Sequence, residues 1–317
     1  MLRLIATRLI QAAGVLLVMS FVVYGLMGLM PGDPLDLMAA ANPHATPADI
    51  ARLKAVYGLD QPLLARYGHW LMAALGGDLG FSRMTARPVL ATLAGPLGNT
   101  AALMGSSLLA AVVLALPCGV LAALRHRRLT DHALNLAAFA AISLPVFWIG
   151  MMLIIAFAVT LTWLPASGVE TVGVGGVTDR LRHLVLPVAA LALASFGHYL
   201  RYMRAAMIGA LRQDWIRTAR AKGLSWRRVV LHHALRNALI PVVTVLALDL
   251  GTLFSGVLVT ETVFAYPGMG KLIYDAVMGS DYNLALAGLL LATGLTLLGS
   301  LLADIAYGLL DPRVRAS

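Results

Sequence analysis

The chain has 317 residues, of which 60% are hydrophobic and only 12% are charged, and its formal net charge at pH 7 is +9. A soluble globular protein carries about 25% charged residues because water must solvate its surface, and a disordered chain combines low hydrophobicity with high charge. The composition excludes both classes. The single cysteine, Cys118, excludes a disulfide framework within the chain and a cysteine metal site.

Six runs are apolar and long enough to cross the hydrocarbon core of a bilayer, which takes about 20 residues of helix. The first run follows Arg3 and Arg8 and exceeds the apolar stretch of a signal peptide, so we expect an uncleaved span. The third is long enough either to tilt or to break at Pro145. The six runs are Leu9–Met30, Thr100–Leu124, Ala133–Leu164, His183–Leu200, Ala238–Val263 and Tyr282–Leu310.

Lys and Arg fall mainly in alternate segments between these runs. With the N-terminus inside, the cytoplasmic segments hold 16 of the 24 cations and have a net charge of +13, whereas the outer segments have a net charge of −1. Excess Lys and Arg mark the cytoplasmic side of membrane proteins. The sequence therefore predicts that both termini are cytoplasmic, and topology explains the basic composition better than nucleic-acid binding does.

The segment 31–99, between the first two runs, is long enough to form a structure of its own. The stretch Thr46–Asp49 is typical of a helix start, and Gly58 suits the end of that helix. Pro62 favours the start of a second helix over Leu63–Leu75. We expect a small helical cap on the outer face, which serves either as scaffold around a pore or as the docking site of an extracellular partner.

The segment Arg201–Pro241 is the most basic part of the chain and contains two predicted short helices. Gly223 suits a helix end because it adopts positive φ, and Ser225 suits the N-cap of the next helix. Ala219 and Ala221 are small enough to let another protein approach the backbone. These features favour a docking element over plain lipid-facing charge. The cations that precede it, which we expect to extend to the lipid surface, are Arg201, Arg204 and Arg212.

Two acids in the fifth run are candidate functional residues, because an acid at mid-membrane costs about 2.5–3.5 kcal/mol on insertion scales and should face protein or water. Asp249 is either a carboxylate that faces a pore or a protonated acid bonded to a neighbouring helix. Glu261 lies three residues before Phe264 at the outer end, which makes it a candidate for a gate that receives substrate.

Short motifs recur along nearly the whole chain in a characteristic order: Pro31–Pro34, Tyr57–Leu63, Gly77–Gly80, Ser143–Trp148, Leu164–Gly168, Arg217–Gly223, His233–Pro241, Glu261–Phe264, Pro267–Gly270 and Leu310–Arg313. With these motifs the chain resembles the inner-membrane permeases of ABC importers, specifically those of the dipeptide, oligopeptide and nickel uptake systems. Arg217–Gly223 corresponds to the EAA loop of that family. It departs from the general pattern, since Arg217-Thr218-Ala219 replaces Glu-Ala-Ala and Arg236 takes the position of a proline, but the peptide-type branch looks similar in both respects.

The resemblance implies an all-α integral membrane protein with six transmembrane helices, of the type I importer class, in a bacterial inner membrane. Its expected parts are an N-terminal transmembrane helix (1–30), an extracytoplasmic helical cap (31–99), a five-helix core (100–310) with a cytoplasmic coupling loop (210–236), and a cytoplasmic tail (311–317). The expected partners are a second permease subunit, two ATPase subunits, an extracytoplasmic substrate-binding protein and membrane lipid. The chain lacks the GxxxxGK[ST] sequence of a P-loop, so we expect ATP and Mg to be bound by the partner ATPases and no cofactor by this chain.

Two sets of site residues follow from the resemblance and the acids. The first is the contact with the ATPase, which we expect at Arg217, Thr218, Ala219, Arg220, Ala221, Lys222, Gly223, Leu224, Ser225, Trp226, Arg227 and Arg228. The second is the substrate path or gate, for which the candidates are Asp249, Glu261, Phe264, Pro267 and Gly268. We expect no catalytic or metal-binding residues.

The favoured function is therefore that of a permease subunit that forms half of a pore for di- or oligopeptides. Nickel and glutathione are alternative substrates in the same family. An intramembrane enzyme is less well supported because the histidines lie in loops or near span ends, and Asp249 and Asp304 lie at different depths. A self-sufficient carrier usually has inverted repeats, and the sequence shows none.

Overall fold

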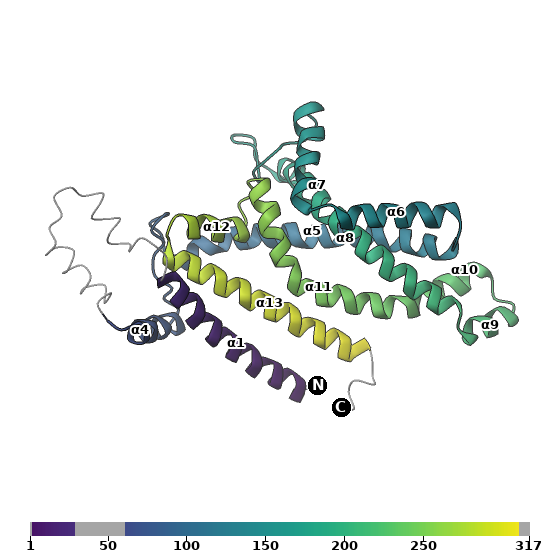
Figure 1. The fold of residues 1–317 in the computed structure, drawn as a ribbon, viewed down its shortest axis with the longest axis horizontal. Helices are drawn as coiled ribbons and strands as arrows, with labels where there is room; N and C mark the ends of the chain where they lie inside the picture. Colours follow the sequence, from purple (N-terminus) through teal and green to yellow (C-terminus); the bar gives the residue numbers. More distant parts are fainter. Residues whose placement is uncertain (1, 29–60, 311–317) are drawn as a thin grey trace. The chain divides into compact units, whose positions relative to one another are not determined.

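The computed structural model describes residues 2–28 and 61–310 (Figure 1). Within these ranges the chain is helical, apart from turns, loops and one isolated bridge between Phe81 and Pro88. Five helices are long and apolar enough to cross a membrane, and the count is six if one bent pair of helices forms a single span. This agrees with the predicted all-helical chain of six spans. The helix expected from Thr46 to Gly58 and the tail 311–317 lie outside the described residues.

Each predicted apolar run corresponds to a helix or to a bent pair of helices. These helices are α1 (Leu2–Gly28), α5 (Val89–Leu124), α6 (Leu129–Ser143) with α7 (Val146–Leu153) and the π-helix η1 (Ile154–Thr160), α8 (Val177–Leu211), α11 (Leu235–Val263) and α13 (Tyr282–Leu310). The shorter helices between them are α4 (Leu63–Leu75), α9 (Asp214–Ala221), α10 (Trp226–Arg228), the π-helix η2 (Val229–Ala234) and α12 (Met269–Met278).

Some helix bounds match the sequence predictions and others do not. Helix α4 covers Leu63–Leu75 after Pro62, as predicted, and α13 covers the whole sixth run. Helix α5 begins at Val89 and not at Thr100, although Pro96 lies within it. Val89 and Leu93 are 0% and 3% exposed, so the burial of this first part outweighs the helix-breaking tendency of its proline.

The third run breaks at Pro145. Leu144 is extended, with φ −94° and ψ 129°, because the ring of a following proline disfavours the helical conformation. Helices on the two sides of the break differ in direction by 101°. Of the two alternatives that the sequence left open, a tilted span and a broken one, the structure has the broken one.

The chain packs as two compact units. Unit 1 is built mainly from Gly98–Lys271, and unit 2 from the described parts of Ala6–Leu97 together with Leu272–Leu295. In unit 1, α8 packs against α6, α7 and α11, and it extends from the region of α7 to α9 (Figure 1). Helix α8 is therefore the central element of this unit.

Two glycines let the neighbours of α8 approach its backbone closely. A Cβ atom at Gly197 of α8 would overlap the carbonyl of Ala138 in α6. A Cβ atom at Gly119 of α5 would lie 2.8 Å from the carbonyl oxygen of Leu200 and 2.7 Å from Cβ of Met203, both in α8. Small residues permit such contacts between membrane helices, so α8 is fixed against both neighbours near its middle.

In unit 2, α4 packs on α1 through aromatic side chains. The hydroxyl groups of Ser20 and Tyr67 are 2.7 Å apart, and the ring of Tyr67 lies 5.7 Å from that of Tyr24 and 6.0 Å from that of Trp70. Tyrosine and tryptophan combine an apolar ring with a polar tip, which suits a helix at the boundary between lipid and water.

A second contact within unit 2 joins the loop before α5 to the turn before α13. Asp281 is 1% exposed; its carboxylate accepts hydrogen bonds from the Ser82 hydroxyl (2.6 Å) and from the Met84 N–H (3.0 Å). Asn283 donates to the carbonyl of Phe81 over 3.1 Å. No local pattern in the sequence marks Asp281, whose partner Ser82 lies 199 residues away along the chain.

Candidate functional site

The basic segment after α8 folds as two short helices that meet at Gly223. Helix α9 ends in a Schellman motif, in which the Leu224 N–H bonds to the Ala219 carbonyl (3.3 Å) and the Gly223 N–H to the Arg220 carbonyl (2.9 Å). Gly223 has φ +76°, as predicted. Ser225 occupies the N-cap of α10, but its side chain makes no capping hydrogen bond.

One side of this loop packs onto the neighbouring helices of unit 1. Ile216 and Ala219 of α9 are 3% and 6% exposed, and they join an apolar cluster with residues of α8 and of the following helices, Met207, Val229 and Ala238 among them. Leu224, next to Gly223, packs against the same cluster. The expectation that Ala219 offers its small side chain to a partner therefore does not fit the structure, because that side chain is buried within this chain. Ala221 is exposed, so its small side chain remains accessible to a partner.

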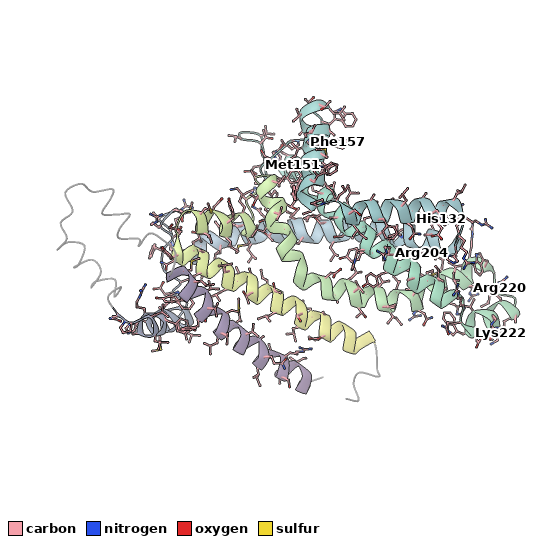
Figure 2. The ribbon with its side chains drawn as sticks, viewed as in Figure 1. His132, Met151, Phe157, Arg204, Arg220 and Lys222 are labelled. Carbon is pink, nitrogen blue, oxygen red and sulfur yellow. The ribbon has the colours of Figure 1, made fainter. Side chains whose placement is uncertain are left out.

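The outer surface of the loop is cationic. Arg220 and Lys222 lie at the end of unit 1 opposite α7 (Figures 1 and 2). The guanidinium of Arg220 stacks over the ring of Trp226, 5.4 Å from its centroid, and Trp226 is itself 49% exposed. Arg217 forms an ion pair with Asp214 on the surface. Exposed residues of the predicted set are Arg217, Thr218, Arg220, Ala221, Lys222, Gly223, Ser225, Trp226, Arg227 and Arg228, and Leu224 is half-buried. We call this surface the α9–α10 knob.

An ion pair that the sequence does not reveal joins α6 to α8. Asp131, in the first turn of α6, is 2% exposed and accepts two hydrogen bonds from Arg204 of α8, from Nε (2.6 Å) and Nη2 (2.8 Å). The Arg127 N–H and Asn135 Nδ2 also donate to this carboxylate, over 2.8 and 2.7 Å. The prediction that Arg204 extends to the lipid surface is therefore wrong. No local pattern reveals a pair 73 residues apart.

The predicted gate residues form a closed turn after α11. Glu261 is 0% exposed, and its carboxylate accepts hydrogen bonds from the Thr100 hydroxyl (2.5 Å) and the Lys271 N–H (3.0 Å). Gly268 is buried against this carboxylate, and a Cβ atom there would overlap it. The structure thus brings Glu261 and Gly268 together, with Glu261 as the internal anchor of the turn.

Two further residues of the predicted gate support the same turn. Phe264 is 2% exposed and packs in an apolar cluster with Ile149, and its carbonyl accepts a hydrogen bond from the Gly168 N–H (3.0 Å). Pro267 is exposed, and its carbonyl accepts a hydrogen bond from Asn99 Nδ2 (2.9 Å). This geometry favours a structural role for Glu261 and Phe264 over direct contact with substrate.

Asp249 lies apart from both regions, within α11. It is half-buried, and its carboxylate forms a side-chain hydrogen bond with Tyr199 of α8, which is 1% exposed. This contact fits the bonded alternative of the two that the sequence left open. No three His, Cys, Asp or Glu side chains in the described ranges gather closely enough to hold a metal ion.

Comparison with known proteins gives concordant matches over the whole chain. The family described as "Binding-protein-dependent transport system inner membrane component" matches residues 115–316, and the corresponding N-terminal family matches residues 1–103. The oligopeptide transport system permease protein AppB of Bacillus subtilis (strain 168) is 37% identical over 312 residues, which cover 98% of each chain.

Two dipeptide-type relatives have similar identity. The di/tripeptide transport system permease protein DppB of Pseudomonas aeruginosa (strain UCBPP-PA14) is 37% identical over 334 residues, and the dipeptide transport system permease protein DppB of Escherichia coli (strain K12) is 34% identical over 337 residues. In both cases 99% of each chain is covered.

Proposed function

The chain belongs to the family of binding-protein-dependent transport system inner membrane components, and from this premise we propose that it forms half of the translocation pore of an ATP-driven peptide importer. Members of this family are multi-pass transport subunits of the inner membrane. The names of the relatives support peptides as the substrate class, since they are an oligopeptide, a di/tripeptide and a dipeptide permease.

In the proposed complex this chain pairs with a second permease subunit, and two ATPase subunits supply the energy. A substrate-binding protein delivers the peptide on the outer side. Both termini and the α9–α10 knob face the cytoplasm, which the excess of Lys and Arg in the corresponding segments supports. No cofactor is assigned to this chain, and ATP and Mg belong to the ATPases.

The α9–α10 knob is the proposed contact with an ATPase. The observation that carries this assignment is the two-sided construction of the loop: its apolar side joins the cluster of Met207 and Ala238, while its cationic side remains exposed. A basic segment that served only as a topology signal for the cytoplasmic side would not need an apolar side packed into the protein. The apolar cluster beneath the knob contains residues of both α8 and α11. A displacement of the knob would therefore be transmitted directly to two membrane helices.

The test of this assignment is the coupling of ATP hydrolysis to substrate in the reconstituted importer, with Gly223 as the target. Gly223→Pro fixes φ near −65° where the native value is +76° and removes the N–H that bonds to Arg220, so we expect it to abolish substrate-stimulated ATP hydrolysis. Gly223→Asn is the matched control, because asparagine tolerates positive φ and keeps the N–H; it should retain most of the coupling.

Membrane insertion separates a coupling defect from a folding defect. Both Gly223 variants should accumulate in the membrane at the wild-type level. Normal uptake by the proline variant would show that the knob is not the coupling element. ATP hydrolysis by this chain in the absence of the companion ATPases would overturn the proposed division of labour.

For Asp249 we propose a place on the substrate path, where its carboxylate meets the ammonium group of a peptide. Asp249→Asn should then reduce uptake of peptides with a free N-terminus and leave uptake of N-acetylated peptides unchanged. Tyr199→Phe removes the hydroxyl that bonds to Asp249 but keeps the charge, and it is the matched variant. Equal losses for both classes of peptide in both variants would assign Asp249 a structural role.

A further inference from the structure

A polar hollow between α6 and α8 has no role in the proposed coupling. It has a volume of 460 Å³ and is lined by Asn135, His198, Arg201, Tyr202, Arg204 and Ala205. Cavities that hold small ligands measure about 300–1,000 Å³. The four residues of α8 at 198, 201, 202 and 205 follow helical spacing, so they share one face of that helix.

The hollow carries an uncompensated positive charge. The charge of Arg204 is balanced by Asp131, which holds its Nε and Nη2 atoms. Arg201, in contrast, pairs with no acid among the described residues; its guanidinium stacks over the ring of Phe139 on α6, 4.9 Å from the centroid. Stacking fixes the position of the guanidinium and leaves its N–H groups able to donate.

The other polar groups of the hollow, like the guanidinium of Arg201, suit an anionic ligand that accepts hydrogen bonds through oxygen atoms. The ring of His198 lies 4.8 Å from that of Tyr202, edge to face, so the two side chains order one another. An imidazole and a phenol both donate hydrogen bonds to oxygen. Arginine is the residue of choice for phosphate because its planar fork of N–H groups matches the oxygens of that anion.

The position of the hollow along α8, relative to the hydrocarbon core of the membrane, indicates where a phosphate bound there would come from. The run Leu184–Leu200 in α8 is free of Lys, Arg, Asp and Glu and measures about 26 Å at 1.5 Å per residue, close to the thickness of the hydrocarbon core, about 30 Å. Arg201 follows this run directly. It therefore lies where hydrocarbon gives way to headgroups, and Tyr202 beside it is of the residue type enriched at that boundary.

We propose that this hollow binds the phosphate of an anionic phospholipid headgroup. Basic pockets between transmembrane helices are known to take such headgroups. The bound lipid would bridge α6 and α8 beside the Asp131–Arg204 pair. The inference does not depend on the transport function or on which leaflet this end faces.

The test measures how much phosphatidylglycerol the full-length chain retains, with phosphatidylcholine as the neutral comparison, by native mass spectrometry after release from nanodiscs of equal composition. The wild type should retain phosphatidylglycerol preferentially. Arg201→Gln should lower that retention about fivefold, the effect expected for one basic residue near an anionic surface. Arg128→Gln is the matched control, since it removes an exposed cation from the turn before α6, outside the hollow.

Two results would overturn the proposal. Equal retention by the wild type and Arg201→Gln would show that the hollow does not select the headgroup. Displacement of phosphatidylglycerol by millimolar inorganic phosphate would assign the hollow to a soluble anion. Arg201→Lys keeps the charge and should retain most of the lipid, and an unchanged unfolding temperature in all variants separates lost binding from lost folding.

Discussion

The loop around Gly223 and the turn around Gly268 are built in opposite ways. In the loop, the apolar residues Ile216 and Ala219 are buried and the cations are exposed. In the turn, the charged residue itself is buried, since Glu261 is 0% exposed and accepts hydrogen bonds from its own chain. A buried charge must be satisfied where it lies, whereas an exposed one remains available to a partner. Both segments contain family motifs, but only the loop offers its charges outward.

Among the variants that test this contrast, the largest effect on stability is expected from removal of the Glu261 carboxylate. Glu261→Ala leaves the buried Thr100 hydroxyl without its carboxylate acceptor, at a cost of about 1–3 kcal/mol, and also removes the acceptor of the Lys271 N–H. We expect a large drop in unfolding temperature and in the amount of folded protein in the membrane. Thr262→Ala, an exposed neighbour on the same helix, should change neither. A stable Glu261→Ala variant with a specific transport defect would restore the gate role for this residue.

An intermediate effect is expected for Gly268→Ala. The new methyl group would press against the Glu261 carboxylate, and overpacking of this kind costs about 1–3 kcal/mol. Gly105→Ala in α5 is the control, because nothing lies within 4 Å of a Cβ atom at that position, and it should not destabilise the protein. Equal unfolding temperatures for the two variants would show that the turn is less tightly closed than its geometry indicates.

The smallest effect on stability is expected in the loop. Arg220→Gln removes an exposed cation and its stacking on Trp226, which together contribute about 0.5–1 kcal/mol at most. Peptide uptake should nevertheless fall, because the proposed contact with the ATPase loses a charge. Arg87→Gln, an exposed cation in unit 2, should leave uptake unchanged. If Arg220→Gln unfolded the protein and Glu261→Ala did not, the contrast between the two segments would be reversed.

Local features of this chain could be predicted from its sequence. Helix α4 begins after Pro62 and covers the predicted residues, Gly223 has the positive φ of a helix end, and Pro145 breaks its span. In each case the cause lies within a few residues, in a ring that fixes φ or in a missing Cβ atom. The uncharged apolar runs likewise predict the long helices, because the thickness of a bilayer sets the length of a spanning helix.

Contacts between distant residues could not be predicted in the same way. Asp131 and Arg204 are 73 residues apart, Thr100 and Glu261 are 161 apart, and Ser82 and Asp281 are 199 apart. One sequence contains no signal for which acid meets which donor, so the sequence alone predicts a gate role for Glu261 and a place at the lipid surface for Arg204. The fold brings to each of these residues the partners that the sequence does not show.

Helix α8 has the geometry of a lever. Its backbone is in contact with α6 at Gly197, and this close crossing is a natural pivot. The arm from Gly197 to Leu211, next to the knob, is about 21 Å long, and the arm from Val177 to Gly197 is about 30 Å long. If α8 tilts as one body, a displacement of 2 Å at the knob, taken as an order-of-magnitude case, moves the other end by about 3 Å in the opposite direction. Under that assumption, the place where α8 crosses α6 sets the ratio of the two displacements.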